Sequence, residues 1–196
     1  MNTIDLATFK DSLERCPVIA AINSDELLEA CKTSSCEIVY VLYGNICTIQ
    51  DIVDQVTAAG KIAVVHIDLI SGLASREISV DFIRQYTKAA GIISTKPQLI
   101  RRGNELGMIT IQRFFMLDRL TYHNIKRHVR DTAPDIVELM PAGLTKMIRY
   151  AIDEAANGKP IIASGLILDN GDVVAALSAG AEAVSTTNTD VWKSID

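Results

Sequence analysis

Eight short apolar runs, rich in Val and Ile, recur along the chain and alternate with segments of helical spacing. Each run is too short for a helix, and its β-branched residues favour a strand. The runs cover residues 18–22, 38–43, 61–69, 91–95, 108–115, 135–140, 160–165 and 182–186. The pattern therefore predicts eight strands, each followed by a helix.

The segments between the runs carry signals for the start and end of a helix. Ser24 precedes two acidic residues and predicts an N-terminal cap. Pro97 stands where the first turn of a helix tolerates its missing N–H, and Gly60 closes the segment that begins at Thr48. Repeated strand–helix units require a parallel sheet with crossover helices, and strands apolar on both faces fit burial from both sides.

Eight such units predict an α/β fold, a (β/α)8 TIM-type barrel that forms one small domain over residues 1–196. The alternative is an open doubly wound sheet, which the absence of G-x-G-x-x-G after the first run disfavours. Residues 1–16 form an amphipathic lead-in segment that we expect to plug the bottom of the barrel. Its apolar positions are Ile4, Leu6, Phe9 and Leu13.

Composition is that of an ordinary globular protein, with 48% hydrophobic residues and a net charge of −5. No apolar run approaches the roughly 18 residues that cross a membrane, and the first residues do not have the pattern of a signal peptide. We therefore expect a cytoplasmic protein without membrane contact. The cysteines at 16, 31, 36 and 47 form no C-x-x-C pair, so we expect reduced thiols on buried faces, no metal and no cofactor.

Polar residues follow the last two apolar runs, where a core strand has no need of them. In a parallel barrel the loops after strands seven and eight frequently bind phosphate through backbone N–H groups and a helix N-terminus. A plain turn would also contain Ser and Gly, but two such endings on adjacent strands favour a phosphate site. The predicted site comprises Ser164, Gly165, Leu166, Ser185, Thr186 and Thr187.

Charged residues end several other runs. His66 and Asp68 are two apart, so in a strand both side chains would face the barrel mouth. Glu138 is isolated among apolar residues and needs a partner, for which Lys96 and Arg113 are the natural cations. With few aromatic residues to stack on a base, this mouth suits a small phosphorylated polyol better than a nucleotide.

Six segments, in this order, resemble the glycerol uptake operon antiterminator family: VVHIDLISGL, GIISTK, ITIQRFFMLD, DIVELMPA, IIASGLI and AVSTTNTDVW. The resemblance spans nearly the whole chain and implies a (β/α)8 fold. It also implies a bacterial cytoplasmic regulator, not an enzyme, that responds to glycerol 3-phosphate and acts on leader mRNA so that transcription passes a terminator. The chain departs from the family pattern at Ser164 and Ala142, where glycines are expected.

The resemblance supports the phosphate site at Gly165, Leu166, Thr186 and Thr187. It also places five charged or titratable side chains around the ligand: His66, Asp68, Lys96, Arg113 and Glu138.

Residues 96–130 contain eight Lys or Arg and only two acidic residues, although the whole chain is acidic. Such a block is either a phosphate-binding surface or a pair of solvated basic helices. From charge alone we expect RNA contact there, by Arg101, Arg102, Arg119, Lys126, Arg127 and Arg130, with Tyr122 and His123 stacking on bases. Ile and Met on helix faces are compatible with a homodimer.

An enzyme is the alternative reading. An aldolase, isomerase or lyase acting on a small phosphorylated polyol or triose could use His66, Asp68, Glu138 and Lys96 in acid–base or Schiff-base chemistry. A third reading is a metabolite sensor that acts on a protein partner.

Overall fold

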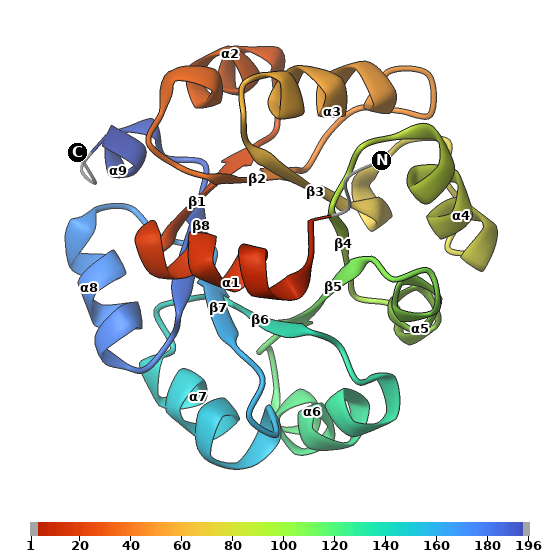
Figure 1. Cartoon of the computed structure of the whole chain (residues 1–196). Coiled ribbons are helices and arrows are strands. Elements are labelled where there is room, and N and C mark those ends of the chain that lie inside the picture. The colour runs from red at the N-terminus through yellow and green to blue at the C-terminus, as the bar shows by residue number, and fades with distance from the viewer. Residues whose placement is uncertain (1–3, 194–196) are drawn as a thin grey trace.

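The predicted barrel is confirmed in the computed structural model, which describes residues 4–193 apart from the side chains at 119 and 122. Eight parallel strands form a closed ring surrounded by helices (Figure 1). The strands are β1 (Val18–Ile22), β2 (Ile38–Val41), β3 (Ile62–His66), β4 (Gly91–Ser94), β5 (Ile109–Phe115), β6 (Ile136–Met140), β7 (Ile161–Ser164) and β8 (Ala183–Thr186). Because β1 pairs with β8, the alternative of an open sheet is excluded.

Helices α2 to α9 follow the strands in turn around the outside of the barrel, whereas α1 precedes β1 and lies across one end of the ring (Figure 1). The helices are α1 (Leu6–Arg15), α2 (Asp25–Thr33), α3 (Ile49–Ala58), α4 (Glu77–Tyr86), α5 (Pro97–Glu105), α6 (Arg119–Thr132), α7 (Thr145–Tyr150), α8 (Asn170–Ser178) and α9 (Thr189–Lys193). A 3₁₀ turn, η1 (Ile67–Leu69), follows β3, and a π-helical turn, η2 (Ala151–Ala155), continues α7. Ser24 caps α2 by accepting from the N–H of Leu27, as its position predicts.

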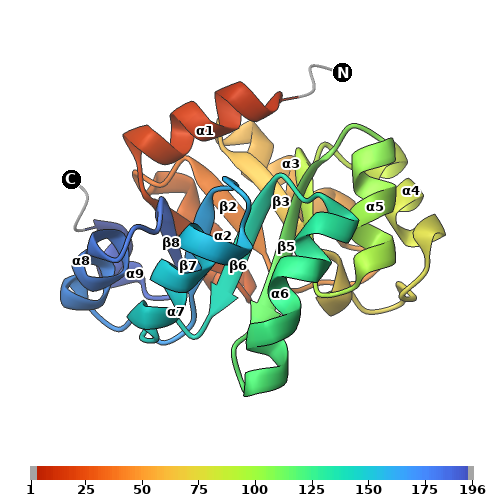
Figure 2. The ribbon, with the colours of Figure 1, turned by 90° about the horizontal axis from the view of Figure 1, so that it is seen from below.

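Helix α1 closes the end of the barrel at which the strands begin (Figure 2). Phe9 and Leu13 are buried against the apolar side chains that fill the barrel. The predicted plug is thus confirmed for the described part of the lead-in, whereas residues 1–3 lie outside the described range. With this end covered, the barrel interior is reached from the opposite end, where the strands finish and from which α6 projects (Figure 2).

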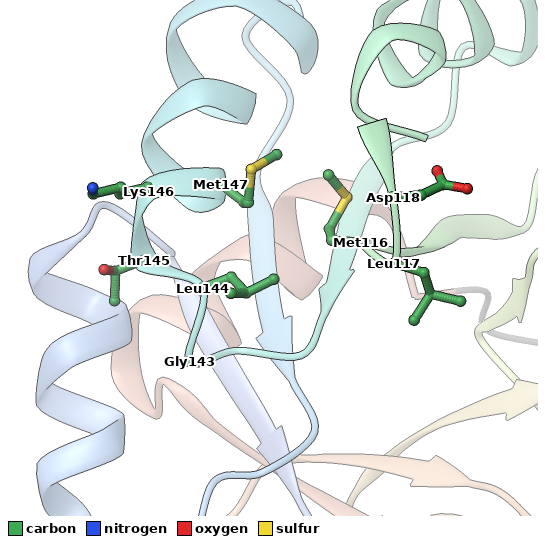
Figure 3. A pocket seen from close by; sticks show the side chains of 8 residues that line it. All are labelled: Met116, Leu117, Asp118, Gly143, Leu144, Thr145, Lys146 and Met147. Atoms are coloured by element: carbon green, nitrogen blue, oxygen red, sulfur yellow. The ribbon is translucent and has the colours of Figure 1, made fainter. Parts of the chain in front are cut away.

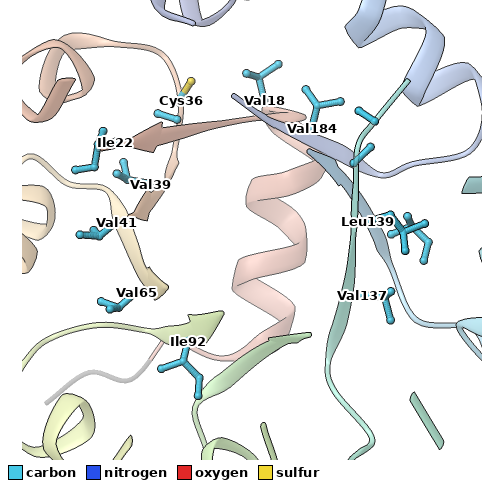
Figure 4. Packing of buried hydrophobic residues seen from close by; sticks show 14 of the residues in the cluster. Val18, Ile22, Cys36, Val39, Val41, Val65, Ile92, Val137, Leu139 and Val184 are labelled. Atoms are coloured by element: carbon cyan, nitrogen blue, oxygen red, sulfur yellow. The ribbon is translucent and has the colours of Figure 1, made fainter. Parts of the chain in front are cut away.

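Alternate residues of each strand supply two apolar layers. One layer fills the barrel, and the other packs between the sheet and the helices; Figure 4 shows part of this outer layer, around Val39, Val65 and Val137. Burial on both faces explains why the strands appear in the sequence as continuous apolar runs.

The four cysteines are free thiols. Cys16, Cys31 and Cys36 are buried, as expected. The expectation is wrong for Cys47, which is exposed because it lies in the turn before α3, where its N–H donates to Asn45 Oδ1 (2.8 Å).

Within residues 4–193, no helix is both long and apolar enough to cross a bilayer.

Candidate functional site

The turn after β7 has a backbone shape suited to holding an anion. Gly165 and Leu166 both adopt left-handed conformations, with φ of 73° and 58°. A Cβ on Gly165 would lie 2.8 Å from Met140 Cγ, so the position requires glycine on both counts. In the described part of the chain, the N–H groups of these two residues have no hydrogen-bond acceptor. Successive N–H groups in such a turn form a concavity that accepts oxyanions.

The end of β8 and the turn after it are hydrogen-bonded to the loop after β7. Thr186 Oγ1 donates to the carbonyl of Ile167 (3.0 Å), and Asn188 Nδ2 donates to the carbonyl of Leu168 (2.7 Å). The indole N–H of Trp192, which is buried on α9, donates to the carbonyl of Thr186 (2.9 Å). These bonds fix the β7 and β8 turns against each other, so that the two endings singled out in the sequence form one structure.

A pocket of about 230 Å³ opens between these turns and reaches into the barrel. It is lined by all six residues of the predicted phosphate site, Ser164, Gly165, Leu166, Ser185, Thr186 and Thr187. Arg113, Ala21 and Leu42 also line it and come from β5 and from the β1 and β2 side of the barrel. The structure therefore brings the predicted residues together, and whether they bind phosphate stays a prediction.

Arg113 and Glu138 form a buried ion pair beside this pocket. Arg113 Nε donates to Glu138 Oε2 (2.7 Å), and a second guanidinium nitrogen donates to Oε1 (3.2 Å). Ser185 Oγ also donates to Oε1 (3.3 Å). The guanidinium is 6% exposed and the carboxylate is fully buried. The partner that Glu138 needs is thus Arg113, a direct neighbour across the β5–β6 register.

Lys96 and Asp68 are placed differently from the expectation. Lys96 is exposed at the start of α5 and does not pair with Glu138. The idea that Asp68 shares a strand face with His66 is wrong, because β3 ends at His66 and the chain turns into η1. Asp68 instead accepts three hydrogen bonds from the turn after β4: from Ser94 Oγ, from the Thr95 N–H and from Thr95 Oγ1.

His66 is buried inside the barrel near the Arg113–Glu138 pair. Burial lowers the pKa of His66 to about 4, and the charge of Arg113 adds to this effect. The imidazole is therefore neutral at physiological pH, with one donor and one acceptor nitrogen.

We expect His66 to make the fold sensitive to mild acid. The unfolded chain takes up a proton near pH 6.5, whereas the folded chain does so only near pH 4, so stability falls between these values as pH decreases. The loss should be about 2–3 kcal/mol, and His66→Gln should remove most of it. Urea denaturation of both proteins at pH 7 and pH 4 measures the difference; an equal acid loss in the variant would contradict this assignment.

Three buried polar atoms have no hydrogen-bond partner among the described residues: Tyr40 Oη, His66 Nδ1 and Ser164 Oγ. Buried polar groups are almost always paired, so each such atom needs an explanation. Sequence reasoning missed Tyr40, because an aromatic residue inside an apolar run is normally core. Its one signal was the phenol group, which needs a partner when buried.

Comparison with known proteins identifies the family. The family described as glycerol-3-phosphate responsive antiterminator matches residues 18–192. The chain belongs to this family. It is 39% identical over 180 residues to the uncharacterized protein YgcP of Escherichia coli (strain K12), covering 92% of this chain and 93% of that protein.

Solved structures agree with this assignment. A glycerol uptake operon antiterminator regulatory protein from Listeria monocytogenes is 27% identical, with a TM-score of 0.86 over 90% of this chain and 95% of that one. An antiterminator-related protein from Thermotoga maritima is 25% identical, with a TM-score of 0.79 over 90% and 97%. Deoxyribose phosphate aldolase from Aeropyrum pernix, at 15% identity and a TM-score of 0.71 over 96% and 92%, shares the fold alone.

The two departures from the antiterminator pattern are accommodated in the structure. Ser164 adds a buried hydroxyl to the pocket, with no partner of its own in the described chain. Ala142 is buried without a left-handed conformation. Its N–H is shared between the carbonyls of Ser164 (2.8 Å) and Gly165 (3.1 Å). The β6–α7 loop is thereby bonded directly to the end of β7 and the turn that follows it.

A second, apolar hollow of about 630 Å³ lies next to that loop. Met116 and Met147 face each other across it, with Leu117 and Leu144 nearby (Figure 3). Leu117 is 81% exposed. The hollow lies between the β5–α6 and β6–α7 loops, and its β6–α7 side is the loop that contacts the turn after β7.

The basic residues of the predicted RNA-binding segment lie on two neighbouring helices. On α5, Arg101 is exposed, but Arg102 is engaged by Asp81 (2.5 Å) and Glu105 (2.8 Å). On α6, the exposed basic side chains include Lys126, Arg127 and Arg130, with His123 exposed on the same helix, and Arg130 contacts Asp131. The side chains of Arg119 and Tyr122 lie outside the described part.

Proposed function

We propose that this protein binds glycerol 3-phosphate at the barrel mouth. The observation that carries the proposal is the left-handed Gly165–Leu166 turn, whose free N–H groups adjoin the unpartnered hydroxyl of Ser164 and the guanidinium of Arg113. Donors without acceptors suit a phosphate group. The pocket volume of about 230 Å³ lies below the roughly 300–1,000 Å³ of pockets for larger ligands, which favours a triose-sized ester.

The ligand would act by ordering the loops at the mouth. A phosphate on Gly165 and Leu166 stiffens the turn to which Ala142 is bonded, and through it the β6–α7 loop beside the apolar hollow. Binding then shifts the population toward one arrangement of these loops, by no more than the ligand's differential affinity for it. This arrangement is the form that binds leader mRNA and allows transcription to pass a terminator.

We assign RNA contact chiefly to α6. Lys126, Arg127 and Arg130 line the α6 side of an open groove of about 710 Å³ and can approach phosphates there, whereas Asp153 and Glu154 line its other side. Arg102 on α5 is less suited, because its guanidinium already binds two carboxylates. A homodimer that buries the exposed leucines around the mouth completes the proposal, and sedimentation with and without the ligand tests it.

An aldolase-type enzyme is not favoured by the geometry. A lysine that forms a Schiff base is usually activated by desolvation or by a neighbouring cation, whereas Lys96 is exposed.

We expect glycerol 3-phosphate to raise the unfolding temperature. At 100 times the dissociation constant, the stabilisation is about 2.7 kcal/mol.

Filter binding then compares leader RNA retention with and without the ligand. Retention should rise with the ligand and fall steeply with salt. Equal retention in both conditions would defeat the gating proposal.

Two variants with the same charge change distinguish an effect on RNA contact from an effect on ligand binding. Lys126→Glu on α6 should weaken RNA retention while leaving the thermal shift unchanged. Lys193→Glu makes the same charge change on α9, which lies across the molecule from α6 (Figure 1), and should leave both unchanged. Equal losses of RNA in the two variants would argue against α6.

A further inference from the structure

Tyr40 neighbours a residue that lines the pocket at the mouth, although it does not line the pocket itself. Ala21 lines the pocket and is paired in register with Tyr40 on the neighbouring strand. Tyr40 packs within the apolar cluster that fills the barrel, so its side chain points inward. Its hydroxyl is fully buried and has no partner in the described chain.

His66 stands next to Tyr40 and one step closer to the mouth. Val64 is the register partner of Tyr40, and His66 follows it two residues later on the same face of β3. Nδ1 of His66 is the second unpartnered atom of the barrel interior. Tyr40 and His66 thus place unpaired side-chain atoms on the inner faces of the neighbouring strands β2 and β3, beneath the turns that we propose bind phosphate.

The chemistry of the barrel interior around Tyr40 and His66 suits neutral hydroxyl groups. The charge of Arg113 is offset by Glu138 at 2.7 Å. Burial lowers the pKa of His66 and raises that of Tyr40, so both are uncharged at physiological pH. A phenol O–H and a neutral imidazole nitrogen together can donate to and accept from an alcohol. A second anion would find no net charge here.

We infer that Tyr40, together with His66, recognises the hydroxyl-bearing carbons of the phosphate ester, which makes Tyr40 a specificity-determining residue. The inference rests on the proposed function, because it takes the phosphate to lie at Gly165 and the carbon chain to extend inward. It predicts selection for hydroxylated esters over alkyl esters of the same length. An unpaired polar group in a site discriminates strongly against a ligand that cannot satisfy it.

Calorimetric titration with glycerol 3-phosphate and n-propyl phosphate tests this inference. Wild type should bind glycerol 3-phosphate at least 10-fold more tightly, since one buried hydrogen bond contributes about 10-fold. Tyr40→Phe should weaken glycerol 3-phosphate binding about 10-fold and leave n-propyl phosphate within 2-fold. The control Tyr43→Phe removes a hydroxyl that donates to Asp25 (2.8 Å), and should change neither affinity.

The outcomes separate the two proposals. Wild type that binds both esters equally overturns the role of Tyr40 and leaves the phosphate site standing. Wild type that binds neither overturns both. If Tyr40→Phe weakens both esters alike and lowers the unfolding temperature without ligand, Tyr40 is structural and the inference fails. The inference expects an unchanged or higher unfolding temperature, because Phe removes a buried hydroxyl without a partner.

Discussion

Replacing Glu138 with Gln should lower the free energy of unfolding by about 3–5 kcal/mol. The substitution keeps the shape of the side chain but removes the only charge that faces the Arg113 guanidinium at 2.7 Å among the described residues. Both groups are almost completely buried, so the arginine charge would stay in a low-dielectric interior without compensation. Urea denaturation at neutral pH measures the loss.

A surface pair provides the control. Arg15 and Glu37 are 2.6 Å apart, but their side chains are 57% and 35% exposed. Glu37→Gln should therefore cost less than about 1 kcal/mol, because water solvates the freed charge. The double variant Arg113→Met with Glu138→Leu should recover much of the stability, because it leaves no charge behind. Similar losses of unfolding free energy for Glu138→Gln and Glu37→Gln would show that burial does not raise the cost of breaking the Arg113–Glu138 pair.

The barrel could be predicted because its signals are local and repeated. Runs such as residues 18–22 and 38–43 are apolar on both faces, which fits only strands covered on both sides. Eight such strands, each followed by a helix, favour closure of the sheet into a barrel. The two turns that line the pocket could be predicted for a related reason: Ser164 and Gly165 interrupt an apolar run at the point where a strand must end.

The charged side chains were harder to predict, because their position depends on where each strand ends. The spacing predicts Asp68 on the strand face of His66, but β3 ends at His66, and in the 3₁₀ turn that follows Asp68 accepts hydrogen bonds from the turn after β4. Lys96 and Arg113 were equal candidates for Glu138, because sequence spacing does not give the register between β5 and β6. Tyr40 is hard to single out from sequence, because its run has the pattern of a core strand and only its phenol group marks the position.

Replacing Gly165 with Ala should reduce the affinity for glycerol 3-phosphate by about 100-fold or more. A residue with a side chain pays about 1–2 kcal/mol to adopt the left-handed conformation. Its Cβ would also lie 2.8 Å from Met140 Cγ, so that either the turn or Met140 must move. The N–H groups of Gly165 and Leu166 would then no longer converge on one point. A misplacement of 1 Å at such a site has effects of this size.

The variant Gly158→Ala is a control that measures the cost of backbone strain without any change at the proposed phosphate site. It has nearly the same φ, 74°, but precedes β7 at the other end of the strand, and nothing lies within 4 Å of a Cβ placed there. Gly158→Ala should cost about the same 1–2 kcal/mol of stability and leave ligand affinity unchanged. Titration and urea denaturation of both variants distinguish the two effects. Gly165→Ala could lose stability like Gly158→Ala and still bind the ester with wild-type affinity. That result would show that the phosphate does not lie on the turn after β7, because the added methyl group and the shift of the turn or of Met140 disturb the approach to these amides.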